Sequence, residues 1–183
     1  MNNSATLPEP RHVIDFWREA GPAKWFARDD AFDARFRELF ADAHWAAARR
    51  ELEPWMDTAD GALALLLLLD QFPRNCFRRS GHAYATDPLA RHYAALAVDA
   101  GFDTQVDPAL RVFMYLPFEH SEDMADQLRC IELTRALDPE YMKYAVAHRD
   151  VIERFGRFPH RNRELGRVNT PDEQAWLDAG GGF

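Results

Sequence analysis

The sequence predicts an all-α protein: a compact helical bundle or a stack of antiparallel helix pairs, with about eight or nine helices and no sheet. Apolar residues recur at helical spacing along most of the chain. No β-branched run alternates with polar residues, as the strands of a half-buried sheet would require. Proline stands just after a residue that can cap a helix, where it suits the first helical turn, at four places: 86–88, 107–108, 138–139 and 170–171.

The N-terminal half divides into three predicted helices, at residues 9–20, 29–50 and 59–71. The first two carry their apolar residues on one stripe, which is typical of helices that cover a core. The third is apolar on every side, so we expect it at the centre of the protein. Pro73 is expected to end this helix, because proline cannot continue the hydrogen-bond ladder.

The C-terminal half contributes the remaining helices. They are predicted at 87–100, 108–115, 121–137 and 139–155, after Pro159, and at 171–179. Pro117 is expected to end the second of these, and Ser121 is expected to cap the third. Thr170 and Glu173 have the spacing of a capping box at the start of the last helix.

Length and composition favour a single domain, residues 9–183, after a mobile tail at residues 1–8. Of the 183 residues, 47% are apolar and 28% are charged, as in ordinary globular proteins. The longest apolar run, 62–69, is much shorter than the roughly 20 residues that cross a bilayer. A signal-peptide pattern is not evident, and Cys76 and Cys130 lack metal-binding spacing, so we expect a cytoplasmic protein with two packed, reduced thiols.

The charge of the chain limits its partners. A net charge of −8 argues against binding to nucleic acid, which usually needs a basic face. Positive charge is nevertheless concentrated between residues 148 and 167, which include six arginines. A small anionic molecule or another protein is therefore the expected partner, and the oligomeric state is left open.

The first polar segment, residues 69–75, follows the most apolar helix. Asp70, Gln71, Arg74 and Asn75 lie within six residues of one another, and polar groups at the end of a buried helix need partners. They could form one wall of a site, or they could tie neighbouring loops together. As site residues, Asp70, Gln71 and Asn75 would orient other groups, and Arg74 would bind an anion.

The second polar segment, residues 115–122, contains Glu119 and His120. Capping explains Ser121 and the acids that follow it, but it does not explain these two. An adjacent acid and imidazole can serve proton transfer or supply metal ligands. Because adjacent side chains point in different directions, the pair alone is not expected to chelate one ion.

The third polar segment covers residues 148–162. Helical spacing predicts that His148 points inward. Arg154, Arg157 and Arg161 could clamp a carboxylate or phosphate through paired hydrogen bonds, or they could pair with nearby acids. In the same segment His160 and Asn162 are candidates to orient the other groups.

Several familiar chemistries have no motif in this sequence. We find no GxGxxG, GxxxxGK[ST], GxSxG or HExxH pattern. The paired ExxH motifs that helical di-iron proteins use do not occur either. A metal site would need acids and histidines to converge from three segments: Asp70, Glu119, His120, His148 and His160. The sequence therefore predicts no cofactor and no metal.

Together these segments resemble the bacterial family known as domain of unknown function 924. The resemblance rests on 16–17, 25–26, 69–75 with 77–78, 115–122 with Gln127, 148–152, 154–162, 165–167 and 170–171. It implies a fold similar to that of tetratricopeptide-like helical proteins, and it implies no reaction, substrate or cofactor. One departure is Phe77-Arg78-Arg79-Ser80, where the family pattern is Phe-Arg-Gly-Thr.

Three functions fit these observations. In the first, the protein binds or processes a small anionic metabolite, with Glu119, His120 and His148 as catalytic residues; whether it is an enzyme is left open. In the second, it is a helical module that binds a protein partner. In the third, the polar cluster is a structural network that locks helix ends together.

Overall fold

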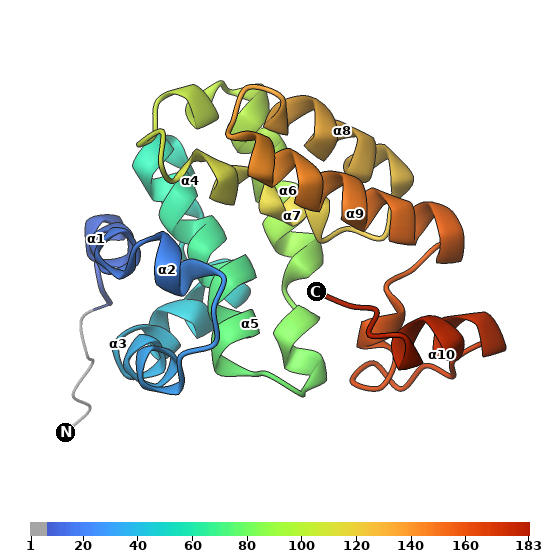
Figure 1. Ribbon diagram of the computed structural model, residues 1–183. Helices are drawn as coiled ribbons and strands as arrows, with labels where there is room; N and C mark the ends of the chain where they lie inside the picture. The colour runs from blue at the N-terminus through green and yellow to red at the C-terminus, as the bar shows by residue number, and fades with distance from the viewer. Residues whose placement is uncertain (1–6) are drawn as a thin grey trace.

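The computed structural model describes residues 7–183, and within this range the chain forms helices and loops without a strand (Figure 1). The all-α prediction is confirmed. The α-helices are α1 (Pro10–Ala20), α2 (Pro22–Trp25), α3 (Asp30–Ala48), α4 (Ala59–Leu66), α5 (Phe72–Cys76), α6 (Asp87–Asp99), α7 (Leu116–Glu119), α8 (Met124–Thr134), α9 (Pro139–Phe155) and α10 (Pro171–Asp178). Five 3₁₀ turns, Glu53–Asp57, Gly81–Tyr84, Phe102–Thr104, Arg111–Met114 and Pro159–Arg161, and one π-helical turn, Leu67–Gln71, complete them.

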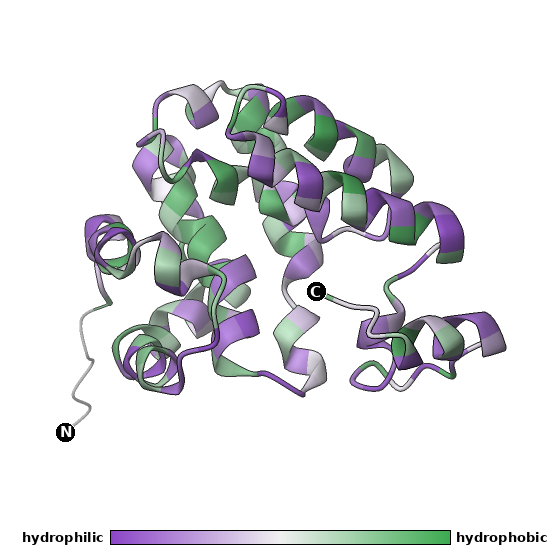
Figure 2. Ribbon diagram, viewed as in Figure 1, coloured by the Kyte–Doolittle hydropathy of each residue, from purple (hydrophilic) through white to green (hydrophobic). Residues whose placement is uncertain are grey.

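Helix α4 lies in the middle of the bundle, as its sequence predicts. Every residue from Gly61 to Leu66 is buried, and the helix contacts both α1 and α6. The apolar stripes of α1 and α3 close one side of this core through stacked aromatic rings, including Phe16 on Phe36 at 5.2 Å between centroids. Apolar residues concentrate on the central helices in Figure 2, whereas the outer helices are more mixed. Helices α8 and α9 pack against each other on the opposite side (Figure 1).

The prediction that Pro73 ends the central helix is wrong. The chain passes from α4 through the π turn into α5, and Pro73 lies in the first turn of α5. The Phe72 N–H donates to the carbonyl of Leu67, five residues back, which is the π-helical pattern. The wider turn gives proline room, so the helix continues to Cys76.

Three carbonyl groups of the π turn accept hydrogen bonds from side chains, and Pro73, which follows, has no N–H to donate to them. The Leu68 carbonyl accepts a hydrogen bond from His44 Nδ1 at 2.8 Å. In the same way, the Leu69 carbonyl accepts from the Thr86 hydroxyl, and the Asp70 carbonyl accepts from Arg74. Three distant or downstream side chains therefore hold the irregular turn in place, and Thr86 does not cap α6 as predicted.

Two further local predictions are corrected around α7. Pro117 occupies the first turn of α7 and so begins a helix. The cap of α8 is Asp123, whose carboxylate accepts from the Ala125 N–H, and the helix starts at Met124. Ser121 instead donates to Asp126 at 2.7 Å and accepts from the Asp123 N–H. The α7–α8 connection is therefore a polar loop whose side chains bind one another.

The C-terminal segment packs beneath the end of α9. Val151, Ile152 and Phe158 form a small apolar cluster that also contacts Trp176 of α10. The predicted capping box of Thr170 and Glu173 is present at the start of α10. Among the described residues, no helix is long and apolar enough to cross a membrane. Most of the predicted mobile tail, residues 1–6, lies outside the described residues.

Both cysteines, and the departure from the family pattern, have simple structural places. Cys76 and Cys130 are buried free thiols, as expected.

Arg79 adopts a left-handed backbone with φ of 62°, where a side chain is strained and glycine is not. This explains why glycine suits the position in the family pattern that the sequence resembles.

Candidate functional site

A polar cavity of about 490 Å³ opens between the start of α6, the α7–α8 connection and the loop that follows α9. Its walls therefore come from two of the predicted polar segments together with α6. Its acidic and basic lining residues are Asp87, Arg91, Glu122, Asp123, Asp126, Arg161 and Arg167, and His120 and Tyr84 also line the cavity.

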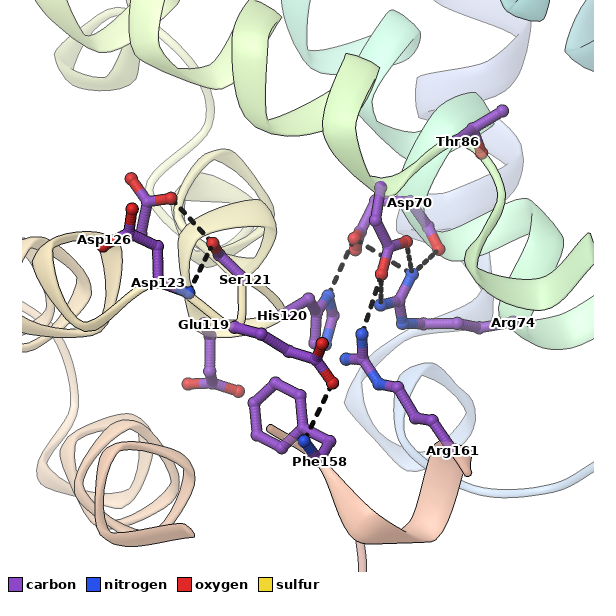
Figure 3. A network of polar contacts seen from close by, with 12 residues as sticks. Asp70, Arg74, Thr86, Glu119, His120, Ser121, Asp123, Asp126, Phe158 and Arg161 are labelled. Carbon is purple, nitrogen blue, oxygen red and sulfur yellow. Dashed lines mark hydrogen bonds and ion pairs between the residues drawn. The ribbon is translucent and has the colours of Figure 1, made fainter. Parts of the chain in front are cut away.

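Asp70 and His120 form a hydrogen-bonded pair beside this cavity (Figure 3). Asp70 lies in the π turn, is almost fully buried, and has its Oδ1 atom 2.7 Å from His120 Nδ1. Gln71 donates to the other oxygen at 2.6 Å. Burial alone would raise the pKa of the Asp70 carboxyl, but the charge of Arg74 and the contact with His120 outweigh it, so the pKa lies below its ordinary value. Asp70 is therefore a carboxylate and can only accept hydrogen bonds.

Asp87 joins the buried guanidinium group of Arg161 to the part-buried one of Arg74. Arg74 donates two hydrogen bonds to it, both at 2.8 Å, and Arg161 Nη1 donates a third at 3.1 Å. The Arg161 guanidinium also lies over the rings of Tyr84 and Phe158, at 4.7 and 4.4 Å from their centroids. Burial, with the nearby charge of Arg74, lowers the pKa of Arg161 to about 10. Arg161 thus remains positively charged at neutral pH.

Arg161 keeps part of its donor capacity unused. Its side chain is only 6% exposed, and its buried Nε has no hydrogen-bond partner among the described residues. Buried polar groups are almost always paired in native structures. This nitrogen is covered from the cavity, so a ligand would meet the terminal nitrogens of Arg161, which among the described residues donate only to Asp87.

Glu119 and His148 lie on the inner side of the His120 ring. The Glu119 carboxylate is buried, accepts a weak hydrogen bond from the Cys130 thiol at 3.9 Å, and lies 3.5 Å from His148 Nδ1. Burial, with the negative charge of Asp70, raises the pKa of Glu119 to about 8. His148 Nδ1 lies 2.9 Å from the Tyr144 carbonyl, and burial lowers the pKa of its ring to about 3.

The end of the chain covers part of this region. The ring of Phe183 stacks on that of His148, with 3.6 Å between centroids, and meets His160 edge to face at 5.6 Å. Burial and the charge of Arg161 lower the pKa of His160 to about 4. The buried Nδ1 of His160 has no partner within the described part of the chain.

The structure brings together six of the residues singled out in the sequence: Asp70, Arg74, Glu119, His120, His148 and Arg161. His160 lies next to them. Gln71 donates a hydrogen bond to Asp70.

The other four predicted residues lie elsewhere. Asn75 donates to Asp33 on the far side of α5. Asn162 donates to Asn169 and Glu173. Arg157 binds Glu173 through two hydrogen bonds at 2.6 and 2.8 Å, and Arg154 is exposed beside Phe155. Arg154 and Arg157 therefore do not reach the cavity.

Six charged residues of the cavity were not among the sequence candidates: Asp87, Arg91, Glu122, Asp123, Asp126 and Arg167. Asp87 was assigned to the start of a helix, where an acid needs no other explanation. Glu122 was assigned to a helix dipole, but it accepts from Arg167 at 2.7 and 2.9 Å and from the Phe158 N–H. Arg91 lies on α6 and donates to Asp126 at 2.9 Å. Because helix capping already explains the acids of this set, the sequence gives no reason to assign them to a site.

Fold and site together define an all-helical protein with a buried carboxylate–histidine pair beside a polar, arginine-lined cavity. The chain belongs to the family described as bacterial protein of unknown function (DUF924), whose model matches residues 13–181. A solved structure of a protein of unknown function from Agrobacterium tumefaciens is 55% identical and superposes with a TM-score of 0.91, covering 93% of this chain and 97% of that one. Curated proteins contain no match.

Proposed function

We propose that this protein binds a small anionic metabolite, a carboxylate or phosphate compound, in the cavity beside His120. Arg161 would make the main contact with the anion. The observation that carries this proposal is that Arg161 lines the cavity while its guanidinium group, among the described residues, donates a hydrogen bond only to Asp87. A guanidinium group matches the geometry of carboxylate and phosphate oxygens, and an ionic hydrogen bond away from water is stronger than an exposed one.

The surroundings of Arg161 support a fixed anion contact. Asp87 holds one edge of the guanidinium, and the rings of Tyr84 and Phe158 restrain its plane. Such a group loses little side-chain entropy when a ligand binds, because it is already ordered. Asp87 also binds Arg74, so it compensates the charge of Arg161 only in part.

The other charges of the cavity favour a small ligand over a polyanion. Arg91 is paired with Asp126, and Arg167 is paired with Glu122. Their charges are therefore largely compensated, which leaves Arg161 as the main attraction for an anion. A nucleic acid would need many uncompensated cations.

His120 adds an acceptor beside the proposed anion. Because its Nδ1 is bonded to the Asp70 carboxylate, Nδ1 carries the hydrogen and Nε2 carries a lone pair. A ligand with a hydroxyl group next to its anionic group would fit both residues. Any proton transfer to or from the ligand would depend on His120, which is the one histidine among the described residues that lines the cavity.

The test is calorimetric titration with inorganic phosphate, citrate, malate and small phosphate monoesters, at constant ionic strength because surface charges are screened by salt. Wild type is compared with Arg161→Gln and with Arg154→Gln, which removes an equal charge at an exposed position away from the cavity. We expect binding by wild type and Arg154→Gln, and at least about 10-fold weaker binding by Arg161→Gln, which corresponds to about 1.4 kcal/mol. Equal affinities of the two variants would refute the proposal.

A further inference from the structure

A cluster of possible metal ligands lies next to the cavity, at the junction of α7 and α9. Glu119, His120 and His148 each offer one ligand atom, a carboxylate oxygen or a ring nitrogen, and these atoms all lie within 4.8 Å of one another. Zinc binds such atoms at about 2.0–2.2 Å, which places two tetrahedral ligands about 3.4 Å apart. Side-chain rotations that move these atoms by about 1 Å would therefore close the set around one ion.

Both histidines are held with a lone pair on Nε2. His120 Nδ1 lies 2.7 Å from Asp70, which is ion-paired with Arg74 and can only accept. His148 Nδ1 lies 2.9 Å from the Tyr144 carbonyl, which also can only accept. Each Nδ1 therefore carries the hydrogen, and each Nε2 carries the lone pair. The His148 nitrogen nearest Glu119 is Nδ1, at 3.5 Å, so ligation through His148 Nε2 requires a rotation of that ring. A carboxylate or a backbone carbonyl bonded to the far nitrogen is the usual support of a metal-binding histidine.

Glu119 is a buried carboxyl group without a strong donor. Its residue is 5% exposed, and among the described residues its carboxylate accepts only the weak hydrogen bond from Cys130. Arg74 and Arg161, the nearest arginines of the cluster, donate to Asp70 and Asp87 instead. A divalent cation would supply the counter-charge that a carboxylate lacks at this position.

We propose that Glu119, His120 and His148 bind a single divalent transition-metal ion of the zinc type. Two imidazoles and one carboxylate suit zinc and its neighbours better than magnesium or calcium, which prefer oxygen ligands alone. Three protein ligands leave one position open, as in catalytic zinc sites. Because His120 also lines the cavity, this position would be reached from it.

This proposal goes beyond anion binding and does not depend on it, since the metal site needs no organic ligand. With the metal bound, the lone pair of His120 Nε2 is taken up by the ion, so a ligand hydroxyl would meet the open metal position in its place. The sequence predicted no metal because adjacent residues rarely chelate one ion. Glu119 and His120 remain a poor pair by themselves, and it is His148, arriving from α9, that completes the set.

The test uses tag-free protein stripped with a chelator and then titrated with Co²⁺ and Zn²⁺ alone. We expect one equivalent of Co²⁺ to bind with the visible absorption of a four- or five-coordinate ion, and Zn²⁺ to displace it. Asp70→Asn should weaken binding by about 10- to 100-fold, because it removes a supporting group. Glu119→Gln and His148→Gln should weaken binding further.

His160→Gln is the matched control, because it removes a neighbouring histidine outside the proposed set. It should leave metal affinity unchanged, and circular dichroism melting of each apo variant would confirm that it is folded. The proposal is overturned if wild type binds less than one equivalent, if folded Glu119→Gln and His148→Gln bind as well as wild type, or if His160→Gln loses binding equally. Failure here leaves the Arg161 comparison with phosphate and carboxylates intact, so the two proposals are refuted separately.

Discussion

Replacing Asp87 by asparagine should destabilise the protein strongly, because this carboxylate pairs with two largely buried arginines: Arg161 would lose its only carboxylate partner among the described residues, and Arg74 would keep only Asp70. The change removes a charge that accepts hydrogen bonds at 2.8, 2.8 and 3.1 Å from Arg74 and Arg161. The side chains are 14%, 17% and 6% exposed for Asp87, Arg74 and Arg161, so water cannot replace the lost charge fully. Removing one partner of a buried ion pair costs about 3–5 kcal/mol.

The matched control is Asp99→Asn at the other end of the same helix. Asp99 pairs with Arg129, but its side chain is 67% exposed, and exposed pairs contribute about 0–1 kcal/mol. Urea unfolding of wild type and both variants at neutral pH gives the comparison. In addition, Asp87→Asn combined with Arg161→Gln should cost less than the sum of the two single changes, because the second removes an uncompensated charge.

A loss below about 1 kcal/mol for Asp87→Asn, equal to that of Asp99→Asn, would refute this reasoning. It would mean that the arginines reach water or find other acceptors when Asp87 is neutral. Strict additivity in the double variant would refute the idea that one carboxylate serves both guanidinium groups.

Two other predictions concern the core. His44 is buried, and burial lowers the pKa of its ring from 6.5 to about 4. As the pH falls, the unfolded chain therefore binds a proton at this residue before the folded protein does. The stabilisation by His44 relative to His44→Asn should be complete above pH 6.5 and fall by about 3 kcal/mol towards pH 4, as measured by urea unfolding across this range; a difference that does not change with pH would contradict the assigned burial. Gly61→Ala should destabilise the protein by about 1–3 kcal/mol, because the new Cβ would overlap the carbonyl oxygen of Trp55. Helix propensity alone predicts the opposite, a gain in stability of about 1 kcal/mol. A higher melting temperature for the variant would contradict the prediction and show that the turn before α4 can move.

The fold could be predicted from sequence where the signals were local. Asp29, Asp138 and Thr170 each accept hydrogen bonds from backbone N–H groups at the start of the following helix. Such caps depend on residues within one turn. The burial of α4 on all its sides likewise follows from its own apolar residues. The path of the chain past Pro73 depended instead on His44 and Thr86, which lie far away in sequence.

The site could be predicted only in part, for a related reason. The polar segments were recognisable, but which arginine met which acid was decided by the packing of α9 and the loop after it. Arg157 turned to Glu173, and Arg161 turned to Asp87. Asp87 itself was hidden, because a carboxylate at the start of a helix has a sufficient local explanation.

The π turn also sets the angular phase of the helix that runs from α4 to α5. Each residue of an α-helix advances the direction of its side chain by about 100°, so one extra residue in a turn displaces everything that follows by that angle. Upstream of the turn, phase is unimportant because the leucines are buried on every side. Downstream it decides that Arg74 reaches Asp87 on the cavity wall while Asn75 reaches Asp33 of α3. The direction of each side chain is therefore unimportant in the apolar part of this helix, and it determines the contacts in the polar part.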